Sequence, residues 1–257
     1  MNRSAHSYSE FMRRLHTVAL DLLTQVRFDK KHRWHLHLVC LYGTMLELLG
    51  SACVLIREDI PVGVPILLRT AIEAYLDFVN LVKDRKYGYY MRAAELREWT
   101  KILREAQTGE NPFLARIARV PKLKDVLTQC DADLEKLKND GFTPLGQKDK
   151  FDKAEAKPVY RSVYNFLCCH SHNNMRALVS RHIDISEDQT DFDVQVYAPV
   201  SFDALLPYID TFCGITMIST EAIHRVLRSH AHARVEGLRQ ELTERRMAIL
   251  SHGGAGQ

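Results

Sequence analysis

The sequence lacks the short motifs that identify many enzymes. It has no Gly-rich phosphate-binding loop, no Gly-x-Ser-x-Gly nucleophile elbow and no Cys-x-x-Cys pair. It has little charge of one sign, since its formal net charge is only +3 over 257 residues, which is too small to demand a nucleic-acid partner. No single motif therefore specifies an activity, and a function has to be inferred from side chains spread along the chain.

Signs of disulfides, metals and cofactors are also scarce. The six cysteines are Cys40, Cys53, Cys130, Cys168, Cys169 and Cys213. Several lie in apolar runs, so we interpret them as reduced core residues of a cytosolic protein. The run from Cys168 to His172 contains zinc-binding residue types, but adjacent residues of one helix point about 100° apart. We therefore predict no metal site and no cofactor.

Segments that would direct the chain to a membrane are weak. The first sixteen residues, MNRSAHSYSEFMRRLH, contain no apolar core of the kind a signal peptide has. The most apolar window is residues 36–56, but it places Glu47 where a bilayer centre would be, at a cost of about 2.5–3.5 kcal/mol. We expect a buried helix there, and a cytoplasmic protein that does not bind a membrane.

What the sequence does contain is helical periodicity. Apolar residues recur at three- and four-residue spacing along most of the chain, and this pattern predicts an all-α, multi-helix bundle. Alternation around the acidic residues 186–193 predicts one small β-hairpin near residues 183–197. We expect a single helical domain, with residues 87–157 as a peripheral helical arm. Residues 230–257 form a charged C-terminal extension that is either solvated or binds a partner.

Two predicted helices carry polar rows that need an explanation. Small or polar residues of the segment 32–58 form one row that we expect to meet another helix: Cys40, Gly43, Thr44, Glu47, Gly50 and Ser51. The helix at residues 65–85 is apolar except for one stripe: Arg69, Glu73, Asp77, Asn80 and Asp84. This stripe is either a solvated face or the wall of a cleft.

Residues 160–182 hold the densest set of groups for acid–base or anion chemistry. They include Tyr164, His170, His172, Asn173, Asn174, Arg176 and His182. On a continuous helix Tyr164, Cys168, His172 and Arg176 would form one row, but Ser and Asn are poor helix formers, so a break near Ser171 is expected. Imidazole moves protons and guanidinium binds phosphate, which suits phosphate chemistry. Alternatively, each histidine bonds a backbone carbonyl or faces water.

Two resemblances bear on function. With LLRTAIEAYLDFVNL followed later by YNFLCCHSHNN, the chain resembles an uncharacterised bacterial helical family of unknown function. More distantly, it is similar to HEPN domains, whose hallmark is Arg, four to six residues, then His. Arg176 and His182 fit that spacing, as do Arg27 with His32 and Arg225 with His230. The HEPN resemblance implies a helical bundle, often dimeric, and a metal-independent ribonuclease of toxin and antiphage systems.

The leading hypothesis is therefore a HEPN-like effector that cleaves or binds RNA, as a homodimer or with a partner protein. In it His172 or His182, with His170 nearby, transfers protons, and Arg176 stabilises the phosphate. Arg69 and Glu73 orient the site, while Asn173 and Tyr164 contact the substrate. The competing hypothesis is a non-catalytic helical sensor or scaffold. A third is a small-molecule hydrolase or nucleotide-binding module.

Overall fold

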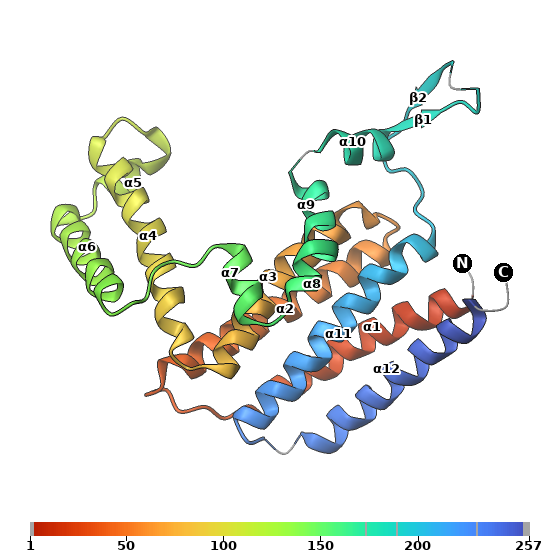
Figure 1. Ribbon diagram of the computed structural model, residues 1–257, viewed down its shortest axis with the longest axis horizontal. Coiled ribbons are helices and arrows are strands. Elements are labelled where there is room, and N and C mark those ends of the chain that lie inside the picture. Colours follow the sequence, from red (N-terminus) through yellow and green to blue (C-terminus); the bar gives the residue numbers. More distant parts are fainter. Residues whose placement is uncertain (1–2, 173, 189, 230, 254–257) are drawn as a thin grey trace.

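The computed structural model describes residues 3–172, 174–188, 190–229 and 231–253 (Figure 1). The helices are α1 (Arg3–Leu23), α2 (Arg33–Arg57), α3 (Val64–Lys83), α4 (Tyr87–Thr108), α5 (Ala115–Ala118), α6 (Leu123–Asn139), α7 (Gln147–Lys153), α8 (Lys157–Val159), α9 (Asn165–Ser171), α10 (Met175–His182), α11 (Phe202–Val226) and α12 (His232–Gly253). A π-helical turn, Tyr160–Tyr164, joins α8 to α9. Strands β1 (Ile183–Ile185) and β2 (Phe192–Val194) pair antiparallel. The predicted all-α bundle with one small hairpin is confirmed.

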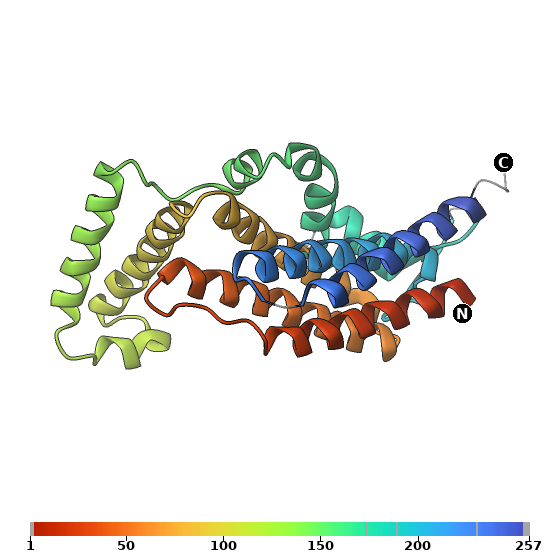
Figure 2. The ribbon, with the colours of Figure 1, turned by 90° about the horizontal axis from the view of Figure 1, so that it is seen from below.

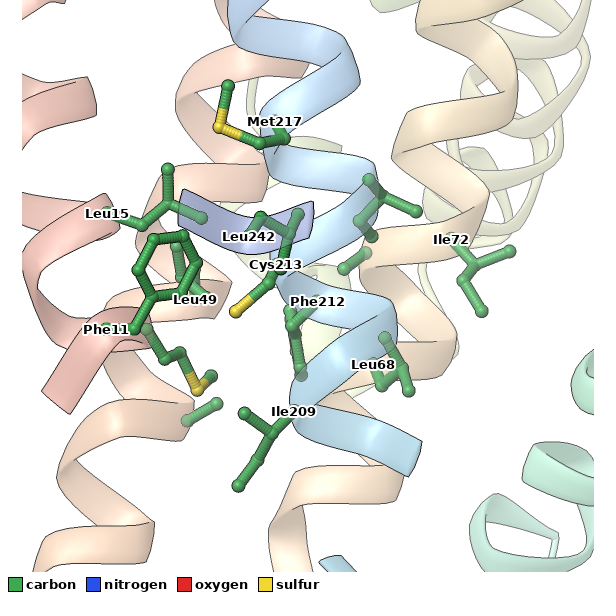
Figure 3. Packing of buried hydrophobic residues seen from close by; sticks show 14 of the residues in the cluster. Phe11, Leu15, Leu49, Leu68, Ile72, Ile209, Phe212, Cys213, Met217 and Leu242 are labelled. Atoms are coloured by element: carbon green, nitrogen blue, oxygen red, sulfur yellow. The ribbon is translucent and has the colours of Figure 1, made fainter. Parts of the chain in front are cut away.

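The long helices α1, α2, α3, α11 and α12 form the body of the molecule (Figures 1 and 2). Their apolar faces meet in a dense core in which Phe11, Leu15 and Leu49 from α1 and α2 are fully or almost fully buried. Phe212 of α11 fills the space between these helices and α3, as Figure 3 shows. Ser201 caps α11 by accepting a hydrogen bond from the backbone N–H of Ala204, which fixes where that core helix begins.

The row of small and polar residues on α2, which the sequence predicts to meet another helix, does so only at Gly50. Thr44 and Ser51 are exposed, and their hydroxyls donate to the carbonyls of Cys40 and Glu47 one turn earlier. Only Gly50 makes a close approach, because a Cβ there would lie 2.7 Å from the His16 ring of α1. Within the described residues α2 is the one helix long and apolar enough to cross a membrane, a test that the core helix of a soluble protein also passes.

The charged C-terminal segment packs on its own bundle. Val235, Leu238 and Leu242 of α12 are buried in the main core beside α1 and α11. Ion pairs flank this stripe: Arg246 lies 2.8 Å from Asp210, and Glu241 pairs with Arg14. The sequence suggested a solvated or partner-binding segment because its apolar residues are few, but three at helical spacing suffice to dock it.

The segment between α3 and α9 divides into two parts. Helices α4 and α6 extend away from the bundle (Figure 1) and share a small cluster of their own that includes Leu103 and Leu127. The chain then returns at α7, where Phe151 is fully buried in the main core. Its ring lies 4.9 Å from that of Tyr164 and 5.1 Å from that of Tyr160, measured between centroids. Phe151 therefore anchors the returning chain to the bundle.

We predict that Phe151→Ala lowers the free energy of unfolding by about 3–5 kcal/mol, because it leaves a cavity among packed rings. The matched control is Phe113→Ala, since Phe113 is 93% exposed and its loss should change stability by no more than about 0.5 kcal/mol. Urea unfolding followed by circular dichroism measures both. Equal stability of the two variants would contradict this role of Phe151.

Candidate functional site

The polar stripe of α3 contacts the chain that returns from the arm. Asp77 accepts hydrogen bonds from Tyr87 Oη at 2.6 Å and from Lys150 Nζ at 2.9 Å. Asn80, which is buried, donates from Nδ2 to the backbone carbonyl of Lys150 at 2.9 Å. Over its first four residues the stripe is therefore neither a solvated face nor the wall of an open cleft, whereas Asp84 at its end is exposed. The stripe is a polar seam that holds the chain from α7 through α9 against α3.

The same seam brings two predicted site residues to Tyr164. Arg69 Nη2 lies 3.1 Å from Glu73 Oε1 and donates to Tyr164 Oη, also at 3.1 Å, while Arg69 Nε donates to Cys168 Sγ at 3.4 Å. Tyr164 Oη in turn donates to Glu73 Oε1 at 2.5 Å. Burial, and then the bond to the Glu73 carboxylate, raises the pKa of Tyr164 far above its usual value. Tyr164 is thus a neutral donor at any physiological pH.

A local irregularity positions the Tyr164 ring. The π-helical turn Tyr160–Tyr164 widens the helix before α9. The rings of Tyr160 and Tyr164 stack at 5.8 Å with an interplanar angle of 21°. Wide turns of this kind re-aim side chains and occur often at functional sites. Here the turn directs Tyr164 to Arg69 and Glu73 while keeping it packed on Phe151.

The histidine segment is broken where the sequence suggested. Helix α9 ends at Ser171, and α10 begins at Met175 after Asn174, whose side chain accepts from the backbone N–H of Arg176 at 3.0 Å. Because the helix breaks, His172 and Arg176 do not continue the row of Tyr164 and Cys168. His172 and Arg176 are exposed, and their side chains form no hydrogen bond or ion pair with the described residues. Asn173 lies outside the described residues.

A cavity of about 660 Å³ lies between α10, the hairpin base and the start of α11, within the range of small-molecule sites. Two histidines and an arginine from the predicted segment line it: His170, Arg181 and His182. The rest of the wall comes from residues 59–62 before α3, residues 195–201 after β2, and α11. Its further lining side chains include Asp59, Pro65, Ser180, Leu205 and Tyr208.

The His182 ring is held by two neighbours. Its Nδ1 lies 3.1 Å from the carbonyl oxygen of Gln195, and its Nε2 accepts from Arg181 Nε at 3.1 Å. An acceptor nitrogen carries no proton, so Nδ1 is the protonated nitrogen and donates to Gln195. A backbone carbonyl that orients Nδ1 leaves Nε2 as the basic nitrogen. His182 therefore combines a structural bond with a nitrogen able to take a proton.

His170 is a neutral imidazole, because burial, and then the nearby charge of Arg181, lowers its pKa below the usual value. Its ring packs edge-on against Phe166 at 5.2 Å. Arg181 forms no ion pair with any carboxylate among the described residues. A partly buried guanidinium without a counter-ion favours an anionic ligand.

The structure thus separates the predicted residues into two groups. Arg69, Glu73 and Tyr164 lie in the polar seam, one helical turn along α3 from Pro65 at the cavity wall. His170 and His182 line the cavity. His172 and Arg176 lie neither in the polar seam nor in the cavity. Arg181 is not among the residues predicted from the sequence. After the break, Ala177 and Arg181 are four residues apart on one face of α10, and this spacing would have identified Arg181 as the cation of that face.

The model of the family of unknown function DUF5677 matches residues 35–191. The chain belongs to this family. The match includes all of the predicted site residues, and it ends within the hairpin, so the part of the cavity wall from residue 195 onward lies outside it. No curated protein and no solved structure matched the chain. Within the described residues, no three His, Cys, Asp or Glu side chains are grouped so as to hold a metal ion.

We predict that Tyr164→Phe lowers the free energy of unfolding by about 1–2 kcal/mol, because Glu73 and Arg69 lose a shared hydrogen-bonding partner. Tyr160→Phe is the matched control, since the Tyr160 hydroxyl makes no hydrogen bond with the described residues. Chemical unfolding of both variants, and of Tyr164→Phe combined with Glu73→Gln, measures the coupling. Strict additivity in the double variant would show that the Tyr164–Glu73 bond contributes nothing.

Proposed function

We propose that this protein is a metal-independent effector that binds and cleaves RNA in the cavity between α10, the hairpin and α11. The observation that carries the proposal is the grouping of His170, Arg181 and His182 around one cavity. Arg181 forms no ion pair with a carboxylate of the described residues. Two imidazoles supply a base and an acid, and a guanidinium supplies positive charge for a phosphate. RNA cleavage is a reaction that uses all three groups.

The reaction follows from these roles. One imidazole takes the proton of the ribose 2′-hydroxyl, whose oxygen attacks the adjacent phosphorus. The bond to the 5′-oxygen breaks, and that oxygen receives a proton from the other, protonated imidazole, giving a 2′,3′-cyclic phosphate and a 5′-hydroxyl end. Arg181 stabilises the extra negative charge on the phosphate oxygens. We assign His170, which is neutral, as the base, and His182, whose ring Gln195 orients, as the acid. His182 Nε2 can carry the proton once Arg181 turns from it to the phosphate.

In this proposal the polar seam has a positioning role. Arg69 and Glu73 fix Tyr164 and Cys168, and His170 follows two residues later on α9, so the seam sets the position of its imidazole. This reaction class, and a cytoplasmic role in bacterial antiphage defence, are what the HEPN resemblance implies. Arg176, one half of the pair that carries the resemblance, lies outside the cavity, so the proposal rests on the residues that line it. We assign the phosphate contact to Arg181 rather than Arg176, because Arg181 lines the cavity.

We predict that the purified chain cleaves single-stranded RNA in the presence of EDTA and leaves cyclic-phosphate ends. Removing a general acid, a general base or the guanidinium in His170→Ala, His182→Ala or Arg181→Ala should lower the rate by about 10²–10⁴-fold. His172→Ala and Arg176→Ala are the controls outside the cavity and should retain activity. Gel electrophoresis of labelled RNA measures the rates, and loss of activity in the controls alone would refute this site.

A second function, a non-catalytic sensor or scaffold, is favoured by the hairpin. Val194 is 72% exposed and Val196 68% exposed, and Tyr197 follows with 70%. The hairpin has two strands of three residues each, and an isolated pair of this size is marginal in water. Exposed apolar side chains on such an element are typical of a surface that binds another protein or a second copy of the chain.

If the hairpin mediates self-association, the purified chain should be a dimer, and Val194→Lys should make it monomeric by placing a charge in the interface. The matched control is Val126→Lys, because Val126 is also exposed but lies on α6 in the arm. Light scattering coupled to size-exclusion chromatography gives the mass of each variant. A dimer that persists in Val194→Lys, or a monomeric wild type, would rule out this mode of association.

A further inference from the structure

A second group of arginines lies at the other end of the bundle from the hairpin. The loop after α1, the start of α2, the junction of α3 and α4 and the end of α11 meet there (Figure 1). They enclose a groove of about 520 Å³. Three side chains with aromatic rings line it beside four arginines: His32, Trp34 and His35. The arginines are Arg27, Arg85, Arg225 and Arg228.

Among the described residues that line this groove, none carries a carboxylate. None of the four arginines forms an ion pair with a described residue, and Arg85 instead lies 4.5 Å above the centroid of the Trp34 ring. Asp29 lies beside the groove, with its Oδ2 3.7 Å from Nε2 of His32. Like charges gathered in one groove repel one another, so this arrangement favours binding of an anion with several charges.

The backbone at Arg228 is a separate sign of function. Helix α11 ends at Val226, and Arg228 follows in the left-handed region with φ of 52°. Glycine is the usual residue there, because a Cβ is disfavoured in that conformation. An arginine at this position adds a guanidinium to the groove, and its strained backbone lowers the stability of the fold. Strained residues of this kind cluster at functional sites.

The helix ends also contribute. Helix α2 begins at the groove with no side-chain cap and no acidic residue in its first turn, so the positive end of its dipole adds to the potential there. The C-terminal carbonyls of α11 carry the opposite partial charge. The full charges of Arg225 and Arg228 at that end outweigh it.

We propose that this groove binds a compact ligand with two or more adjacent phosphate groups, such as inorganic polyphosphate or the phosphate chain of a nucleoside triphosphate. Each guanidinium can bind phosphate oxygens as a fork, and four of them converge in one groove rather than along an extended path. A chain of linked phosphates matches that density of charge better than a nucleic acid, which has one phosphate per nucleotide. This site is separate from the cavity of His170 and His182 and does not depend on RNA cleavage.

The test is isothermal titration calorimetry of the full chain, at constant ionic strength, with tripolyphosphate, ATP, inorganic phosphate and sulfate. We expect tripolyphosphate to bind about tenfold or more tightly than inorganic phosphate or sulfate. Tighter binding of ATP than of tripolyphosphate would support a nucleotide as the source of the phosphates, and equal binding would support inorganic polyphosphate. Similar weak affinity for all four anions would overturn the proposal.

Two variants make the test independent of folding. Arg228→Gly removes the guanidinium but suits the left-handed backbone, so it should weaken tripolyphosphate binding about tenfold while leaving the melting temperature equal or higher. Arg225→Gln should weaken binding by a similar factor. Arg116→Gln is the control, since Arg116 is an exposed arginine of α5 outside the groove. Unchanged binding in Arg228→Gly and Arg225→Gln would overturn the proposal. So would tighter binding of a twelve-nucleotide RNA that the same variants abolish.

Discussion

The arrangement of this protein depends on how one central helix satisfies its polar side chains. Helix α3 is apolar on the faces that meet α2 and α11, and its remaining face carries Arg69, Glu73, Asp77 and Asn80. Partly buried polar groups without partners destabilise a fold, whereas paired ones specify which segment may pack there. The segment that packs there is the chain from Lys150 to Cys168. Lys150 supplies a cation and a backbone carbonyl, Tyr164 a phenol and Cys168 a thiol.

The cavity follows from this pairing. Since Tyr164 and Cys168 are fixed on α3, α9 ends at a defined place, and the break after Ser171 turns the chain away from the bundle (Figure 1). Helix α10 then carries Arg181 and His182 back over residues 59–62, and the hairpin returns Gln195 to His182. This geometry arises from the hydrogen bonds of Tyr164 and Cys168 with α3 and from the helix break.

Local sequence patterns predicted the parts of the structure that local physics controls. The helical bundle, the hairpin around residues 186–193 and the break near Ser171 all follow from periodicity and residue preference within a few positions. What could not be predicted is which distant segment satisfies a polar group. The sequence hypothesis placed Arg69, Glu73 and Tyr164 in one site, but nothing near them in sequence indicates that the Tyr164 hydroxyl bonds to both of the other two. The lining by residues 59–62 and 195–201 was missed for the same reason.

The arginines show why composition alone misled about charge. Those of α12 are paired within the bundle, for example Arg245 with Glu241 and Arg246 with Asp210. Such pairs cancel in the net charge and stabilise the docking of a helix. Arg181 in the cavity and Arg225 with Arg228 in the groove have no carboxylate partner among the described residues. A net charge of +3 therefore conceals two places where positive charge is left uncompensated. The distribution of charge over the surface, and not its sum, is therefore what bears on ligand binding.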